Sequence, residues 1–407
     1  MNTILTMILA GALMFGEPPR VANKTQPEGD PRPVSLVEDL RIGPETHEDV
    51  GFWPGFSVKV AVNAAGLTAV ADDRENRIVV FNHDGSLNRI LGGFGQGPGE
   101  FQHLRRVQFL ADGRLVAFEA QGYFAMTFFD KDLNYVEKIT PRTAYLCHHY
   151  EFSPKADLAW ADTVRNSGGH TERGTQVLKP NGDIVHTIQT HKVMHFRQDK
   201  MMEPAFWAEY IGDQLKKQAQ GLGGFGAFAP DGTLYTAVGK RYEITQWRAD
   251  GTGKVRTITR DTKPNRLTEA EIAAVIKPIR QSIKAQLPPD VAAVVTPSVV
   301  EKAIDHAGFL PGRMPINGLK VMEDGTLLVI TDYNRLTGLS TADLFDTDGR
   351  FLGSFQHPNA GLQNMVFKNG YATTIETDED DENTLVRYRI QRGEGKTEGR
   401  TPTKPKP

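Results

Sequence analysis

The stretch VNAAGLTAVADDRENRIVVFNHDGSL, residues 62–87, contains two tight turns about twenty residues apart. Gly66 and Gly85 supply the positive φ angles that hairpin turns need, and the Val, Leu and Ile residues around them favour half-buried strands. Two turns at this spacing define a unit of four antiparallel strands. The stretch therefore predicts one small sheet, and the rest of the chain repeats its pattern.

The first kind of turn occurs six times along the chain and the second kind five times. The first series lies at Gly66, Gly113, Asp157, Gly232, Gly325 and Gly370, and the second at Gly85, Asp132, Gly182, Gly251 and Gly349. The sixth unit lacks an outer strand, and PVSLVEDLRIG (Pro33 to Gly43) is left without a partner at the other end of the chain. Pairing this segment with LVRYRI (Leu385 to Ile390) would leave no sheet edge open. The pattern predicts an all-β fold, a six-bladed β-propeller closed by an N-terminal strand.

Two intervals between turns of the first series are longer than the repeat and predict insertions at about residues 191–221 and 262–311. Trp207, Ile211 and Leu215 follow the period of one helix face in the first insertion. In the second, Thr268 and Glu271 form a capping box before an apolar helical pattern, and another helix begins at Thr296-Pro297. We expect helical insertions between blades 3 and 4 and between blades 4 and 5. They either cover exposed sheet or form a lid or partner surface.

The ends of the chain differ in composition from its body. Residues 1–18 read as a signal peptide, with an apolar run from Ile4 to Phe15 that is too short to span a bilayer. No Lys or Arg precedes this run, so an uncleaved interfacial anchor and a cytoplasmic protein are the alternatives to export. Residues 19–32 read as a linker, 33–390 as the propeller, and 391–407 as a disordered tail. We expect a periplasmic or secreted protein without a membrane span.

Charge and cysteine content exclude some classes of function. The net charge is −3 with both signs interspersed, which does not suit binding to nucleic acid. The lone Cys147 cannot form an internal disulfide, so it does not indicate a redox compartment. The acidic run Glu376 to Glu382 lacks the ligand spacing of calcium loops and reads as a solvated loop.

The order of elements in residues 62–101 resembles the NHL repeat. A turn at Gly66, a strand ending in Asp72, the Asn76-Arg77-Ile78 element, a turn at Gly85 and the connection GGFGQGPGEF (Gly92 to Phe101) follow each other as in that repeat. The resemblance implies a bacterial six-bladed propeller of NHL type, and most such proteins have no assigned activity. The five glycines of the connection suit a cramped crossing between blades, with Phe101 as a plug, rather than a nucleotide loop.

In a propeller, the loops before the inner strands and those between second and third strands meet at one channel mouth. Polar side chains at these places are the candidate ligand-binding residues: Asp72, Arg74, Arg105, Arg106, His148, His149, Arg241, Asn317, Asp332, Asn334 and Asn364. Glu119, Asp162, Arg165 and Glu376 belong to the same loops.

A metal site at this mouth is a weaker hypothesis. Asn317, Asn364 and Asp332 resemble the ligands of lactonase-type propellers, and His148 and His149 fall where amidating-lyase-type propellers hold zinc. The metal candidates are His149, Asn317 and Asn364. His148 and His149 are consecutive, so on a regular strand their side chains would point to opposite faces. His191 and His195 lack a second ligand pair and read as surface or packing residues. We predict no cofactor, with calcium or zinc as the alternative.

No nucleophile elbow, HExxH or CxxC occurs in the sequence, which therefore indicates no reaction. The first hypothesis is an exported monomeric binding module that recognises a protein, peptide or glycan at the channel mouth. The second is a metal-dependent hydrolase or lyase of lactonase or amidating-lyase type acting at the same mouth. No catalytic residue can be named.

Overall fold

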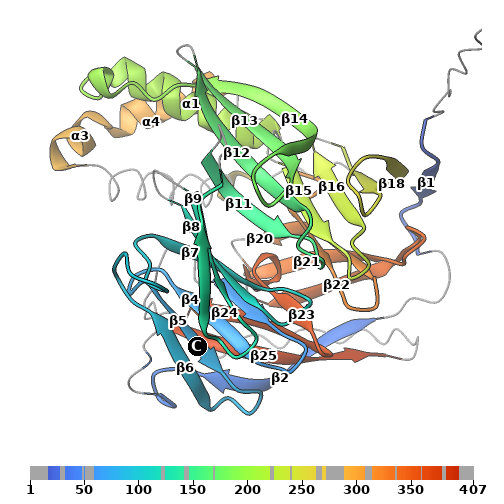
Figure 1. Ribbon diagram of the computed structural model, residues 1–407. Coiled ribbons are helices and arrows are strands. Elements are labelled where there is room, and N and C mark those ends of the chain that lie inside the picture. The colour runs from blue at the N-terminus through green and yellow to red at the C-terminus, as the bar shows by residue number, and fades with distance from the viewer. Residues whose placement is uncertain are drawn as a thin grey trace, which may run out of the picture.

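The described strands form six small antiparallel sheets arranged as the blades of a propeller (Figure 1). The computed structural model describes residues 17–27, 33–47, 50, 59–120, 124–141, 146–167, 170–220, 224–238, 241–262, 268–271, 288–307, 314–334, 337–358, 360–377 and 382–393. The sequence-based prediction of an all-β, six-bladed propeller is thus confirmed. The signal-peptide prediction for residues 1–18 and the predicted tail fall almost wholly outside the described residues.

Each blade has an inner, a second, a third and an outer strand. The inner strands are β3 (Lys59–Val62), β7 (Leu104–Phe109), β11 (Leu146–Phe152), β15 (Gly224–Phe228), β19 (Gly318–Val321) and β23 (Val366–Lys368). The second strands are β4 (Thr68–Asp72), β8 (Leu115–Ala120), β12 (Ala159–Ser167), β16 (Leu234–Val238), β20 (Leu327–Asn334) and β24 (Tyr371–Thr377). The third strands are β5 (Arg77–Phe81), β9 (Phe124–Phe129), β13 (His170–Leu178), β17 (Glu243–Trp247), β21 (Leu339–Phe345) and β25 (Asn383–Arg392). The outer strands are β6 (Leu87–Gly92), β10 (Tyr135–Ile139), β14 (Ile184–Met194), β18 (Lys254–Arg260), β22 (Phe351–Pro358) and β2 (Val34–Ile42).

The backbone has positive φ angles at the turns that the sequence predicts. All nine glycines of the two turn series have positive φ, between 71° and 94°. In the two turns that lack glycine, positive φ falls on Ala156 (57°) and Leu133 (64°), one residue away from the expected Asp157 and Asp132. Both residues donate their backbone N–H to the carbonyl three residues earlier, so the hairpin is closed without glycine.

The N-terminal strand closes the ring as predicted. β2 pairs antiparallel with β25 from Val34↔Arg392 to Ile42↔Leu385, with one irregularity between Glu38 and Leu40. Asp39 accepts hydrogen bonds from Arg387 and Arg389 across this pair. Blade 6 is therefore built from both ends of the described chain.

The core consists of apolar clusters between successive blades. Phe101, fully buried, packs among side chains of β4, β5, β7 and β9, between blades 1 and 2. It fills the space beside Gly92, where an added Cβ would lie 2.3 Å from the Phe101 ring. The last cluster joins Ile42 and Leu385 of blade 6 to Val70 and Phe81 of blade 1. Burial of apolar area thus continues around the whole ring.

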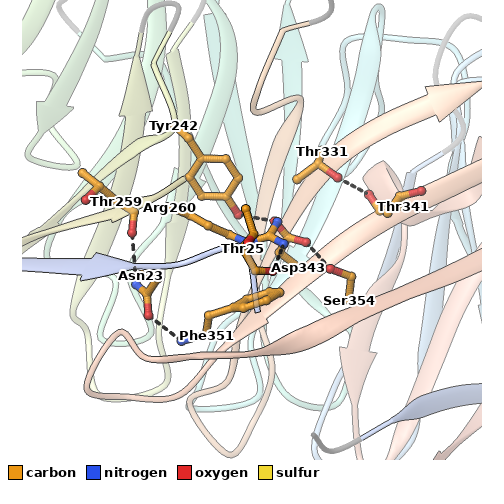
Figure 2. Close-up of polar contacts among 10 residues, drawn as sticks. All are labelled: Asn23, Thr25, Tyr242, Thr259, Arg260, Thr331, Thr341, Asp343, Phe351 and Ser354. Atoms are coloured by element: carbon orange, nitrogen blue, oxygen red, sulfur yellow. Dashed lines mark hydrogen bonds and ion pairs between the residues drawn. The ribbon is translucent and has the colours of Figure 1, made fainter. Parts of the chain in front are cut away.

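One strand was not foreseen. β1 (Arg20–Asn23) lies in the segment that the sequence analysis took for a linker, and it pairs parallel with β18 as a fifth strand of blade 4. Its last residue, Asn23, is 3% exposed and bonds to both blade 4 and blade 5 (Figure 2). The four residues show no alternation of polar and apolar side chains, so the sequence gives no strand signal. They are ordered by pairing with the edge strand β18, which lies some 240 residues later in the chain.

The predicted helical insertions are present. α1 (Pro204–Gln220) lies between blades 3 and 4, and α3 (Pro289–Val294) and α4 (Pro297–Ala307) lie between blades 4 and 5. The expected capping box is also formed, since Thr268 and Glu271 exchange hydrogen bonds and residues 269–271 are helical. The helix expected to follow lies outside the described residues. α1, α3 and α4 share an apolar cluster of their own that includes Phe206, Trp207, Val291 and Val299. Short 3-10 turns occur at Gln198–Lys200 and Ala360–Gln363.

The insertions mark one face of the ring. In blade 1 the start of β3 pairs with the end of β4, and the end of β4 pairs with the start of β5. The starts of inner strands, the second-to-third loops and the connections between blades therefore share a face, which we call the mouth face. The opposite end carries the turns between inner and second strands and is called the turn face. The helices leave from the mouth face, at one end of the molecule in Figure 1. In the described part of the chain, no helix has the length and apolar character needed to cross a bilayer.

Candidate functional site

The six inner strands can be aligned by their turns. In blades 1 to 5 the residue that accepts the turn hydrogen bond is Asn63, Leu110, Ser153, Ala229 or Met322. In blade 6 the equivalent residue is Lys368, which pairs with Tyr371 across the turn. Counting back along each strand from this reference residue assigns every inner-strand residue to a ring around the channel. Residues of one ring lie at the same depth.

Four residues before the reference, the ring nearest the mouth contains Lys59, Arg106, His149, Phe225, Gly318 and Asn364. Two residues before it, the next ring contains Ala61, Gln108, Glu151, Ala227, Lys320 and Val366. Charged side chains are thus concentrated in two neighbouring layers of an otherwise apolar wall. Lys59, Arg106, Glu151 and Lys320 together are called the channel cluster.

Contacts within and around the channel cluster are close. Arg106 Nη2 donates to Glu151 Oε2 at 3.0 Å, and both side chains are about one fifth exposed. Lys59 Nζ donates to Asn364 Oδ1 at 2.8 Å across the junction of blades 1 and 6. Within the described part of the chain, the ammonium of Lys320 forms no ion pair. Among the described residues, the ion pair of this cluster is thus the one between Arg106 and Glu151.

The surroundings of the two lysines lower their pKa values. Burial, reinforced by the positive charges of Arg106 and Lys320, lowers the pKa of Lys59 to about 8. Burial also lowers the pKa of Lys320, an effect that Glu151 opposes and Arg106 strengthens. Both shifts mean that the protonated form of each lysine is less stable here than it would be in water.

The channel cluster adjoins a cavity. Arg106, Glu151 and Lys320 line a space of about 180 Å³ inside the ring. This space shares Gln108, Glu151 and Phe228 with a larger chamber of about 630 Å³ that opens among the turns of the turn face. The described cavity thus runs from the channel cluster toward the face opposite the predicted mouth.

The structure brings only part of the predicted site residues together. Arg106 lines the cavity, and Asn364 accepts a hydrogen bond from Lys59 of the channel cluster. Arg105 instead forms an ion pair with Asp73 at 3.4 Å, and Asp72 binds Arg77 and the Glu75 backbone within its own loop. The Asp72 carboxylate, 3% exposed, therefore holds the loop of blade 1 together.

The other candidates occupy separate places on the mouth face. Asn317 donates to the carbonyls of Met314 and Thr331, so its amide group fixes the entrance to β19. Asn334 donates to Glu271 at 3.2 Å and joins blade 5 to the second insertion. Arg241 is exposed before β17, Asp332 follows an irregularity in β20, and Arg74 lies in the loop after β4.

For His148 and His149 the structure describes the backbone alone. The pairing of β11 with β12 shifts between Cys147 and His149, so the regular alternation assumed for this histidine pair does not hold there. His149 takes a register position in the ring nearest the mouth. His191 lies in β14, and the Nδ1 atom of His195 bonds to Thr171 Oγ1 at 3.2 Å.

The sequence reasoning missed Lys59, Glu151 and Lys320. Each lies inside an inner strand rather than before it, in the contexts KVAV, YEF and LKV. A charged residue within a short apolar strand was the available signal, because such a residue is costly unless it faces a channel or a partner.

The described residues contain no group of three or more His, Cys, Asp or Glu side chains suited to a metal ion. The arrangement at Asn364 is also unfavourable for a cation, because the Lys59 ammonium lies against its side-chain oxygen. The geometry at this depth of the channel favours an anion.

Comparisons with known proteins find similarity among solved structures only. No family model and no curated protein sequence matches the chain. Among solved structures, the chain is similar to a putative exported protein from Bacteroides fragilis, with 10% identity, a TM-score of 0.46, and coverage of 91% of this chain and 99% of that one. It is similar to a member of the DUF4221 family from Bacteroides vulgatus, with 8% identity, a TM-score of 0.49, and coverage of 88% and 99%. A virginiamycin B lyase from Staphylococcus aureus shares 13% identity, with a TM-score of 0.33 and coverage of 88% and 89%.

Proposed function

We propose that this chain is a binding propeller that holds the anionic group of its ligand at the channel cluster. The observation that carries the proposal is the group of three cations inside the ring, Lys59, Arg106 and Lys320, of which Lys320 forms no ion pair among the described residues. Maintaining unpaired charge in a confined space costs stability, so its presence favours a functional role. A carboxylate, as found on peptides, glycans and smaller molecules, fits this environment.

A binding role is favoured over the metal-dependent hydrolase or lyase. Lactonase-type chemistry would need the Asn364 oxygen for a divalent cation, but Lys59 donates to that oxygen at 2.8 Å. Arg106 at the same depth and Lys320 one ring deeper would also repel a metal ion. The same charges attract a ligand carboxylate and steer it into the ring.

The narrower features of the protein are part of this proposal. The NHL-type assignment is supported by the contacts of the motif residues: Asp72 binds Arg77, and Asn76 Oδ1 accepts the backbone N–H of Leu104 at the start of blade 2. We further propose an exported monomer, with the mouth face and its helices as a separate surface for a protein, peptide or glycan, distinct from the channel ligand. The bond between Asn334 and Glu271 supports this, since it fixes the second insertion beside the mouth.

The test measures small anions on the purified protein. Acetate, compared with chloride at equal ionic strength, is expected to raise Tm, because a ligand that binds the folded state stabilises it. The Lys320→Met variant should lose most of this increase while keeping the fold. Lys302→Met on α4 removes an equal charge from an exposed position and should respond like the wild type.

Two results would contradict the proposal. One is an acetate response that is absent from the wild type or unchanged in Lys320→Met. The other is a tightly bound stoichiometric calcium or zinc ion that is lost in Asn317→Ala or Asn364→Ala, which would favour the metal-dependent enzyme instead.

A further inference from the structure

One ring of the inner strands is entirely apolar. The residues directly before the turn references are Val62, Phe109, Phe152, Phe228, Val321 and Phe367, and we call them the phenylalanine ring. All six line the 630 Å³ chamber on the turn face. Val62, Phe109, Phe228 and Val321 are only partly buried, although the rest of each blade interface is closed. Phe152 and Phe367, at 2% and 8% exposed, also pack into the apolar clusters between blades. Two phenylalanines and two valines at one depth therefore face a solvent-accessible space that they could have filled.

The phenylalanine ring follows the channel cluster immediately along the strands. Glu151 and Lys320 precede Phe152 and Val321 by one residue, and Lys59 precedes Val62 by three. At about 3.3 Å per strand residue, the full set of charges lies within about 10 Å of the ring. The cavity is thus cationic at its inner end and apolar at the phenylalanine ring, while Asp112, Lys131, Glu323 and Lys368 line it at the turns.

Polarity along the cavity restricts the ligand. Side chains of the phenylalanine ring cannot accept or donate hydrogen bonds, so the amides of a peptide or the hydroxyls of a glycan would lose their water there without replacement. An alkyl or aryl group loses nothing and gains by leaving water. The chamber volume lies within the range of about 300–1,000 Å³ that is usual for small-molecule sites.

We propose that the ligand is an amphiphilic carboxylate, with its carboxylate at the channel cluster and its alkyl or aryl body inside the phenylalanine ring. This inference rests on the proposed function, because it uses the same cations. It adds the class of ligand and the direction of binding, from the turn face inward. Charged residues at the chamber rim, such as the pair formed by Lys368 and Glu323 at 2.6 Å, keep this opening hydrated.

The experiment compares three probes by calorimetry at neutral pH: decanoate below its aggregation concentration, acetate, and decanol. Decanoate is expected to bind at least tenfold more tightly than either acetate or decanol, because it alone uses both ends of the cavity. Phe109→Ser should weaken decanoate at least tenfold and leave acetate unchanged. Phe196→Ser, at a 37% exposed phenylalanine outside the channel, is the matched control and should change neither.

The outcomes separate this inference from the proposed function. Equal affinity for acetate and decanoate, both dependent on Lys320, would overturn the amphiphile and leave the anion site standing. Decanol binding as tightly as decanoate would show an apolar chamber without a carboxylate anchor and would also overturn it. If neither anion binds, both proposals fail. If Phe109→Ser loses its fold, Phe228→Ser, at another partly exposed ring position, replaces it in the same comparison.

Discussion

Buried charges in this protein are of two kinds, and their partners distinguish them. Asp343, 1% exposed, accepts hydrogen bonds from Tyr242, Arg260 and Ser354 (Figure 2). Arg260 also stacks over the Phe351 ring at 3.9 Å. The Asp343 carboxylate is thus matched by three donors, so it joins blades 4 and 5 and calls for no ligand. Lys320, in contrast, forms no ion pair among the described residues.

The lowered pKa of Lys59 makes anion binding depend on pH. Because its pKa is about 8, Lys59 is mostly protonated at pH 7 and mostly neutral at pH 9. The pKa of Lys320 is lowered too, so this lysine also loses its positive charge more readily as pH rises. Arg106 and Glu151 face the same space, but arginine and glutamate side chains do not ordinarily change charge between pH 7 and pH 9. We expect decanoate affinity to fall several-fold between pH 7 and pH 9, measured by calorimetry.

The sign follows from linkage: an anion binds the protonated lysine better, so removing the proton removes part of the binding energy. Lys59→Met keeps a stem of similar length without a charge. It should bind decanoate more weakly at pH 7 and show a flatter pH profile. An affinity that rises with pH, or an unchanged profile in Lys59→Met, would disprove the role given to Lys59.

Among the elements, β1 shows how a short segment can be ordered by one side chain. Asn23 donates to the carbonyls of Gly349 at 2.9 Å and Thr259 at 3.1 Å, and it accepts from the backbone N–H of Phe351 at 2.8 Å. It thus connects the edge of blade 4 to the outer turn of blade 5. The pairing of β1 with β18 alone would be an exposed edge of four residues.

Asn23→Ala is expected to lower the free energy of unfolding by about 1–3 kcal/mol, because the buried N–H of Phe351 loses its acceptor. Hydrogen exchange should also accelerate in residues 20–23. Denaturant unfolding and exchange mass spectrometry measure the two effects. Asn88→Ala, at an exposed asparagine, should stay within about 0.5 kcal/mol of the wild type. Equal stability of both variants would mean that β1 is not anchored by Asn23.

At the scale of the whole molecule, the sequence was sufficient for the scaffold because its determinants are local. Gly66 and Gly85 specify turns within their own neighbourhood, and repetition of such turns implies a ring. The channel cluster escaped prediction because its contacts are not local. Lys59 and Asn364 are 305 residues apart and meet only when the ring closes. Arg106 was found because the sequence analysis expected it in the loop before an inner strand. Its partner Glu151 was missed because it lies in the next blade.

Ring closure itself gives the last prediction. Ile42 of β2 is 3% exposed and packs between blades 6 and 1, whereas Val37 on the same strand is 45% exposed. Ile42→Asp would bury an unpaired carboxylate at this junction and is expected to lower the free energy of unfolding by more than about 3 kcal/mol. Val37→Asp, with the same new charge in solvent, should cost less than about 1 kcal/mol.

Deleting residues 33–43 removes the whole strand and should cause aggregation, because β25 becomes an open edge. Cooperative unfolding of a soluble deletion protein, followed by circular dichroism, would show that the ring does not depend on β2.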